Sequence, residues 1–143
     1  TTTTLYLTFA SIQRTVAVVG ELLTNPNMNG CEISEGGLVY SWTGGAKSFA
    51  IVPSFFSNEA VSDTCQAGLS TQSGSDTASQ TVMIPSAGNY DFSALFGCFS
   101  TVIGQSCTLG LTIDGNNIPL SGSTLPGENP TTFVSSTASG ISL

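Results

Sequence analysis

Residues 82–99 read VMIPSAGNYDFSALFGCF, and this segment has the strongest β-strand pattern of the chain. Pro85 ends its apolar start, and Gly88 lets the chain turn before a long run of β-forming residues. Tyr90 and Phe92 begin that run two residues apart, so they face the same way in a strand. We therefore predict two strands joined by a short turn, at residues 81–84 and 89–99.

Further β-rich runs lie on both sides of this stretch. They predict strands at residues 4–10, 15–19, 39–42, 49–52, 107–113, 118–120 and within 131–143. Asp-Gly-Asn-Asn at 114–117 predicts a tight hairpin because Gly and Asn accept positive φ, and Gly44-Gly45 predicts a second one. Residues 57–79 are polar and predict a long loop with one short strand. Many short strands without a convincing helix predict an all-β fold, an antiparallel β-sandwich.

Charge is scarce in this chain. Its 143 residues, a length that fits one domain, include 2 Lys+Arg, 9 Asp+Glu and no His. A net charge of −7 repels phosphates and anionic lipids, and the longest apolar stretch, 16–23, is far shorter than the roughly 20 residues that span a bilayer. Without His, no Ser-His-Asp or Cys-His site can form in one chain. We therefore expect no nucleic-acid partner, no membrane insertion, and no metal or other cofactor.

Four cysteines are present, and none is in a CxxC spacing. They are Cys31, Cys65, Cys98 and Cys107. An even set without zinc spacing favours disulfides, and disulfides favour an extracellular location or a cell or virion surface. Cys98 and Cys107 are close enough in sequence to bridge two paired strands, which would leave Cys31 for Cys65. Three pairings are open, as are free thiols and bridges between subunits.

Part of the chain resembles the C1q/TNF-like jelly-roll family. Residues 82–92 are similar to its central motif, an apolar strand followed by Pro, two small residues, Gly, one residue and aromatic-x-aromatic. Residues 109–116 resemble its next strand and hairpin, and residues 137–143 resemble a strand that precedes two closing strands. The resemblance covers about residues 80–143 and implies a jelly-roll-like sandwich. Because the sequence stops at Leu143, we expect a missing closing strand and an open edge.

The expected open edge suggests that the N-terminal residues supply the missing strand. We divide the chain into an N-terminal strand segment, 1–20, and a β-sandwich domain, 21–143. The segment completes its own sandwich, or it inserts into a neighbour by donor-strand complementation. In the second hypothesis Leu5, Leu7 and Phe9 are the plugs, and a head-to-tail exchange that does not close gives a filament. Both hypotheses are open at this point.

Acidic residues are the candidates for chemistry. Two near pairs occur, Glu32 with Glu35 and Glu59 with Asp63. They lie in turn-like segments without an aromatic cleft for a sugar, so solvated loop charge is favoured over glycoside hydrolysis, and we expect no enzymatic activity. Asp76 and Asp91 carry oxygens that suit calcium, but no EF-hand spacing supports such a site.

Four aromatic residues are candidate exposed contacts. They are Tyr40, Trp42, Phe55 and Phe56. Tyr40 and Trp42 share one face of the predicted strand, where they pack in the core or, if exposed, stack on a carbohydrate. Phe55 and Phe56 face opposite ways in an extended segment, so one of them is exposed in a monomer. That fits a subunit interface, where aromatic residues are enriched.

Together these features predict a structural subunit of an extracellular filament, pilus-like appendage or surface fibre. Copies of the chain would be its partners and would assemble by β-strand complementation and disulfide-stabilised packing. The alternative is a trimeric C1q/TNF-like binding or adhesion head on a spore, phage or cell-surface fibre. Such a head would bind a carbohydrate or a surface receptor.

Overall fold

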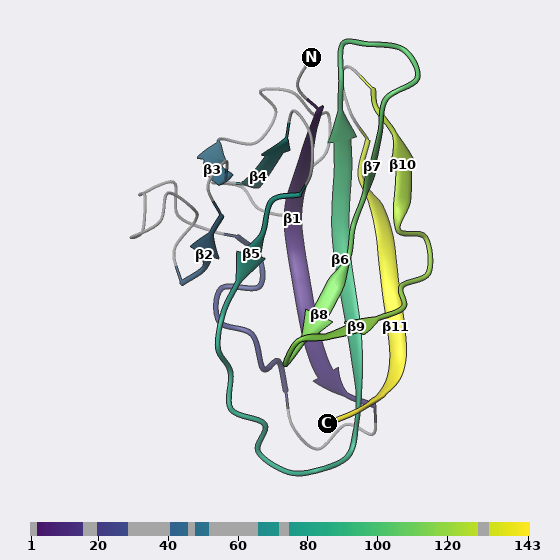
Figure 1. The fold of residues 1–143 in the computed structure, drawn as a ribbon. Helices are drawn as coiled ribbons and strands as arrows, with labels where there is room; N and C mark the ends of the chain where they lie inside the picture. Colours follow the sequence, from purple (N-terminus) through teal and green to yellow (C-terminus); the bar gives the residue numbers. More distant parts are fainter. Residues whose placement is uncertain are drawn as a thin grey trace.

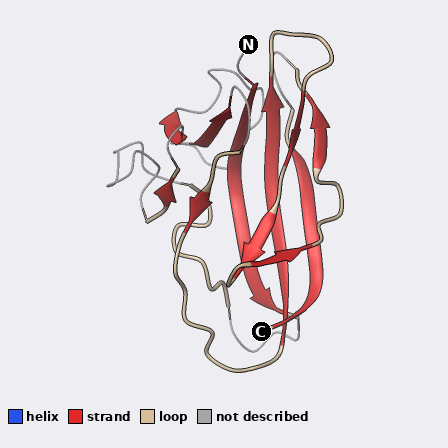
Figure 2. Ribbon diagram, in the orientation of Figure 1, coloured by secondary structure: helices blue, strands red, loops and turns tan. Residues whose placement is uncertain are grey.

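The fold was analysed in a computed structural model, shown in Figure 1. The structure describes residues 3–15, 20–28, 41–45, 48–51, 66–71, 75–128 and 132–143. Throughout these ranges the regular structure is strand, and Figure 2 shows no helix. The predicted all-β fold with antiparallel strands is confirmed. In the same ranges, no helix is long and apolar enough to cross a membrane.

Five strands form the main sheet, in the order β11-β6-β1-β4-β3. Their bounds are Thr3–Arg14 (β1), Ser48–Ile51 (β3), Gln66–Thr71 (β4), Asn89–Phe99 (β6) and Val134–Ser142 (β11). Every neighbouring pair is antiparallel. The predicted strand 89–99 is therefore confirmed as β6, which lies beside β1 near the middle of the sheet.

Three short ladders form a second layer, drawn in front of the main sheet in Figure 1. They are β2 (Thr43–Gly44) with β5 (Ala78–Ser79), β7 (Ser106–Thr108) with β10 (Thr124–Pro126), and β8 (Leu111–Ile113) with β9 (Asn116–Ile118). The hairpin predicted at 114–117 is confirmed between β8 and β9. Its Asp114 and Gly115 have φ of 48° and 79°, the left-handed values that such a turn requires.

The hairpin predicted around Gly44-Gly45 is wrong. β2 pairs with β5, and β3 pairs with β4, so the two segments belong to different sheets. Gly45 N donates to Thr77 O at 2.8 Å, and a Cβ at Gly45 would lie 3.1 Å from Thr77 N. Glycine at this position permits the close approach of two backbones. In the sequence alone, such a glycine cannot be distinguished from one that forms a turn.

Other predicted boundaries also differ from the structure. The predicted strand 107–113 is divided into β7 and β8 at residues 109–110, and the predicted loop 57–79 contains β4 and β5. Residues 81–84 belong to none of the ladders, although a strand is predicted there. Their side chains are alternately exposed and half-buried, as in a strand. The segment therefore has the burial pattern of a strand but no paired neighbour among the described residues.

A bulge in β1 sets which of its side chains face the second layer. Leu7 pairs with Phe96 and Phe9 with Leu95, so the register shifts between Leu7 and Phe9. Leu5 and Leu7 before the shift, and Ala10 and Ile12 after it, line the space between the layers. Phe9 does not line that space, because the extra residue moves it out of the alternation with Leu5 and Leu7.

The N-terminal strand lies at the centre of its own chain's sheet. β1 pairs with β6 along Thr4–Arg14 and with β4 along Thr3–Leu7. In this single chain, residues 3–14 therefore pair with their own sheet on both sides. Exchange of this strand between copies stays a prediction.

Tyr6 belongs to the buried side of β1 that faces away from the second layer. Its side chain is 2% exposed, and its ring meets that of Phe99 edge to face at 6.4 Å. Burial raises the pKa of Tyr6 to about 12, because the phenolate would lose its hydration there.

Candidate functional site

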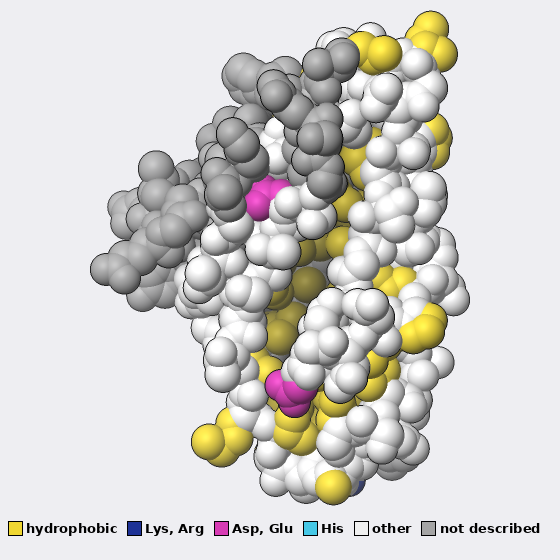
Figure 3. Space-filling view, in the orientation of Figure 1, with side chains coloured by type: hydrophobic (Ala, Val, Ile, Leu, Met, Phe, Trp, Pro, Cys, Tyr) yellow, Lys and Arg dark blue, Asp and Glu magenta, His cyan; other side chains and the backbone are white. Residues whose placement is uncertain are grey.

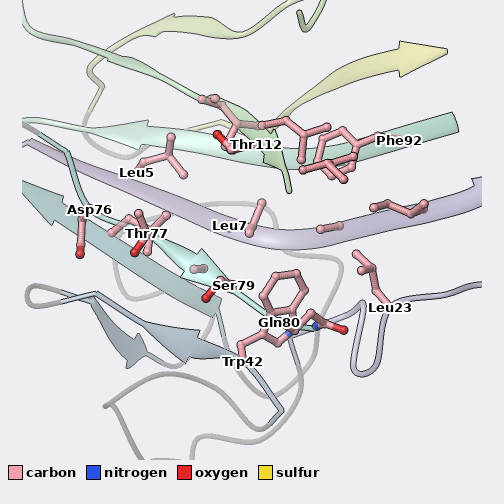
Figure 4. A pocket seen from close by; sticks show the side chains of 18 of the residues that line it. Leu5, Leu7, Leu23, Trp42, Asp76, Thr77, Ser79, Gln80, Phe92 and Thr112 are labelled. Carbon is pink, nitrogen blue, oxygen red and sulfur yellow. The ribbon is translucent and has the colours of Figure 1, made fainter. Parts of the chain in front are cut away.

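An apolar groove of about 780 Å³ opens between the two layers. Its floor is the main sheet, with Leu5, Leu7 and Ile12 of β1 and Phe92 of β6 among the residues that line it. In Figure 3 the floor is visible as a hydrophobic strip between paler walls. Figure 4 shows Leu5, Leu7 and Phe92 from close by, with Trp42 across the opening. The floor side chains are only 5–7% exposed, so the groove is a narrow space between the layers rather than an open apolar patch.

One wall of the groove is the segment that follows β5. The side-chain amide of Gln80 anchors it, accepting from Thr24 N at 2.8 Å and donating to Thr24 O at 3.0 Å. Val82 and Ile84 line the groove and are half-buried, whereas Met83 between them is 89% exposed. Within the described ranges the backbone N–H and C=O groups of residues 81–84 make no hydrogen bond. This wall therefore offers an unpaired strand edge as well as apolar side chains.

The opposite wall consists of β7, β8 and the residues between them. Leu109, Leu111 and Ile113 line the groove and are half-buried. A disulfide joins Cys98 of β6 to Cys107 of β7 with a Cα–Cα distance of 5.6 Å, the pairing that the sequence favoured. This bond fastens the second layer to the main sheet beside the groove.

The turn before β6 is held by several polar contacts. Arg14 donates from Nη1 to Ser86 Oγ at 2.7 Å and from Nη2 to Ala87 O at 3.1 Å. The Tyr90 hydroxyl donates to Ser86 O at 2.6 Å, which ties the turn to the start of β6. Gly88 exchanges two backbone hydrogen bonds with Leu143, each of 3.0 Å. These contacts position the segment that becomes the first wall.

The charges near the groove are acidic. Asp76 and Asp114 are among the lining residues, and those of the lining that the structure describes include no Lys or Arg. Asp91 lies elsewhere, where its Oδ1 accepts from Thr15 Oγ1 at 2.8 Å and from Gly140 N at 3.0 Å. The structure therefore does not bring Asp76 and Asp91 into one site. Among the described residues, no three His, Cys, Asp or Glu side chains are grouped to hold a metal ion.

Trp42 is the single tryptophan of the chain, and it lines the groove. It is 7% exposed, and its Nε1 donates to Asn25 O at 3.0 Å. Trp42 is therefore a core residue that borders the groove rather than an exposed aromatic contact. At this exposure its indole offers little surface on which a sugar could stack.

The remaining predicted site residues lie outside the described ranges. They are Cys31, Cys65, Tyr40, Phe55 and Phe56, together with the acidic residues Glu32, Glu35, Glu59 and Asp63. Two features were not predicted from the sequence. One is the groove itself, and the other is Ile103, whose side chain is 100% exposed in the loop between β6 and β7. The signal for Ile103 was an apolar pair, Val102-Ile103, inside a short loop flanked by two cysteines.

Comparison of the chain with protein-family models, with curated proteins and with solved structures finds no match.

Proposed function

We propose that the chain is a structural subunit of an extracellular filament, pilus-like appendage or surface fibre. A segment of a neighbouring copy fills the groove and completes the second layer by β-strand complementation. The single observation that supports this proposal most is the space of about 780 Å³ that the second layer leaves over the apolar side of the main sheet. Its floor side chains Leu5, Leu7 and Phe92 are only 5–7% exposed, so it is a concave space between the layers, and concave spaces with an apolar lining commonly bind a partner group.

The first wall supports the strand-like mode of assembly. The unpaired backbone of residues 81–84 can take up hydrogen bonds from an extended segment, while Val82 and Ile84 already point toward the groove. Each Ile or Leu side chain that a neighbour buries there contributes roughly 1.5–3 kcal/mol. A few such side chains, together with the backbone bonds, are enough to offset the cost of association.

The charge of the chain sets the conditions for assembly. Copies with a net charge of −7 repel one another at low ionic strength. At about 0.15 M salt, surface charges are screened beyond about 8 Å, and burial of apolar surface then dominates. The Cys98–Cys107 disulfide is stable in an oxidising compartment, which supports assembly outside the cell.

The test is a charge placed inside the groove, with a matched control on its rim. In Val82→Asp a carboxylate faces the groove, whereas in Met83→Asp the same charge sits on a neighbouring side chain that is 89% exposed. We expect the wild type and Met83→Asp to form polymers in sedimentation velocity and negative-stain microscopy. We expect Val82→Asp to stay monomeric with unchanged circular dichroism.

Two results would contradict this proposal. One is a wild-type chain that remains monomeric at every concentration and salt, and the other is a Val82→Asp chain that polymerises like the wild type. A closed species with the mass of three chains would instead favour the trimeric adhesion head. Deleting the N-terminal strand is not a usable test, because β1 lies between β4 and β6 and its loss would unfold the sheet.

A further inference from the structure

Two large hydrophobic side chains are exposed among the described residues, Met83 and Ile103. Ile103 is 100% exposed and belongs to the loop that joins β6 to β7. Figure 1 shows this loop projecting beyond the sheet at one end of the molecule. Since Ile103 is fully exposed, it makes no contact with the groove of its own chain.

The loop that carries Ile103 is held in place at its base. The Cys98–Cys107 disulfide closes it across nine positions of sequence. Ser100 Oγ accepts from Val102 N at 3.1 Å and donates to Val102 O at 3.3 Å, and Gln105 O accepts from Gly127 N at 2.8 Å. An apolar side chain presented on an ordered loop loses less conformational entropy when it binds than one on a free segment.

We propose that Ile103 is the side chain that one copy inserts into the groove of the next copy. This inference rests on the proposed function and names the part of the neighbour that fills the groove. The groove supplies the apolar surroundings that Ile103 lacks in a monomer. In the described part of the chain the backbone groups of Ile103 and Gly104 are unpaired, as are those of residues 81–84, so the two segments can also exchange hydrogen bonds.

The charge of the Ile103 loop is compatible with the groove. The groove is lined by Asp76 and Asp114 and by no cation among its described residues, so an acidic segment would be repelled. No residue from 99 to 113 is charged, although the whole chain has a net charge of −7. The loop at residues 100–105 can therefore approach the groove without facing a like charge on the inserted segment.

The geometry of this contact gives an open assembly. The loop projects at one end of the molecule, whereas the groove lies between the layers, so two different surfaces of the chain meet (Figures 1 and 3). A contact between two different surfaces repeats from copy to copy and, unless the rotation closes a ring, produces a filament. Each internal copy then uses both its loop and its groove.

The test removes the inserted side chain and keeps the groove. Full burial of one Ile corresponds to roughly a tenfold to hundredfold change in affinity. We expect Ile103→Ser to raise the critical concentration for polymer formation by that factor, and Met83→Ser, which removes the other exposed apolar side chain, to change it less than about twofold. If Ile103→Ser polymerises like the wild type, this inference is overturned while the proposed function stands.

A mixing experiment tests the pairing directly. Ile103→Ser keeps the groove, and Val82→Asp keeps the loop. At concentrations below the raised critical concentration of Ile103→Ser, each variant is expected to be monomeric alone and to form a one-to-one dimer with the other. Trp42 lines the groove and is the single tryptophan, so its emission should shift when the two are mixed. A mixture that stays monomeric, with unchanged Trp42 emission, overturns the inference. A wild type that never polymerises overturns the proposed function, and the inference falls with it.

Discussion

The Cys98–Cys107 disulfide links β6 to β7 and is expected to contribute several kcal/mol to the stability of the fold. Replacing both cysteines by alanine opens a loop that the bond closes across a sequence separation of 9. The chain-entropy relation for a loop of this length gives about 2.6 kcal/mol at 25 °C. Both sulfurs are buried, with Cys98 0% and Cys107 8% exposed, so lost packing adds about 1 kcal/mol. We expect the free energy of unfolding to fall by about 3–4 kcal/mol.

The measurement is guanidinium unfolding at 25 °C without reductant, followed by circular dichroism. A second variant, with valine at both positions, restores apolar volume but not the covalent link. We expect it to recover the packing part and to remain about 2.6 kcal/mol less stable than the wild type. Full recovery by the valine variant, or a loss below about 1 kcal/mol in the alanine variant, would refute the loop-closure reasoning. The alanine variant should also polymerise less readily, because the base of the Ile103 loop is released.

Two further predictions concern the core and a tight backbone contact. Burial raises the pKa of Tyr6 to about 12, while an unfolded tyrosine titrates near 10, so stability should be unaffected below pH 10 and fall by about 2–3 kcal/mol as pH rises to 12. Urea midpoints across this window measure the loss, and an equal loss in Tyr6→Phe would contradict Tyr6 as its source. Gly127→Ala should destabilise the fold by about 1–3 kcal/mol, because its Cβ would lie 2.5 Å from Ser100 Cβ and 3.3 Å from Gln105 O. Gly110→Ala, with nothing within 4 Å, should change stability by less than about 0.5 kcal/mol, and equal effects in urea unfolding would contradict the steric explanation.

The parts of the fold that the sequence predicted well are those with local causes. The strand 89–99 follows a turn that Pro85 and Gly88 define, and its first aromatic residues keep a strict period of two. The hairpin at 114–117 depends on Gly115 and its neighbours, which accept positive φ. In each case the residues that determine the structure lie within a few positions of one another, so no distant contact is needed to recognise it.

The failures have a common physical cause, which is that strand pairing is not local. Gly44-Gly45 looks like a turn, but Gly45 allows β2 to approach a segment more than thirty residues away. The bulge between Leu7 and Phe9 depends on how β1 pairs with β6, and the residues around it still alternate in sequence. A pattern of side chains indicates which face is apolar, but it does not identify the partner strand.

Because strand pairing is not local, the sequence also did not predict the groove. A strand is predicted at residues 81–84, and in the structure Val82 and Ile84 line the groove and pack against the core. Yet both stay half-buried, and the backbone between them has no partner in the described part of the chain. At the C-terminus, where an open edge is predicted, β11 is an outer strand of the main sheet and pairs with β6. The unpaired residues 81–84 are a further edge, in the second layer. Residues 81–84 have both the sequence and the conformation of a strand. The backbone groups of a strand need hydrogen-bond partners on a neighbouring segment. The described part of the chain leaves that edge unpaired, and the proposed insertion of a second copy would supply its partner.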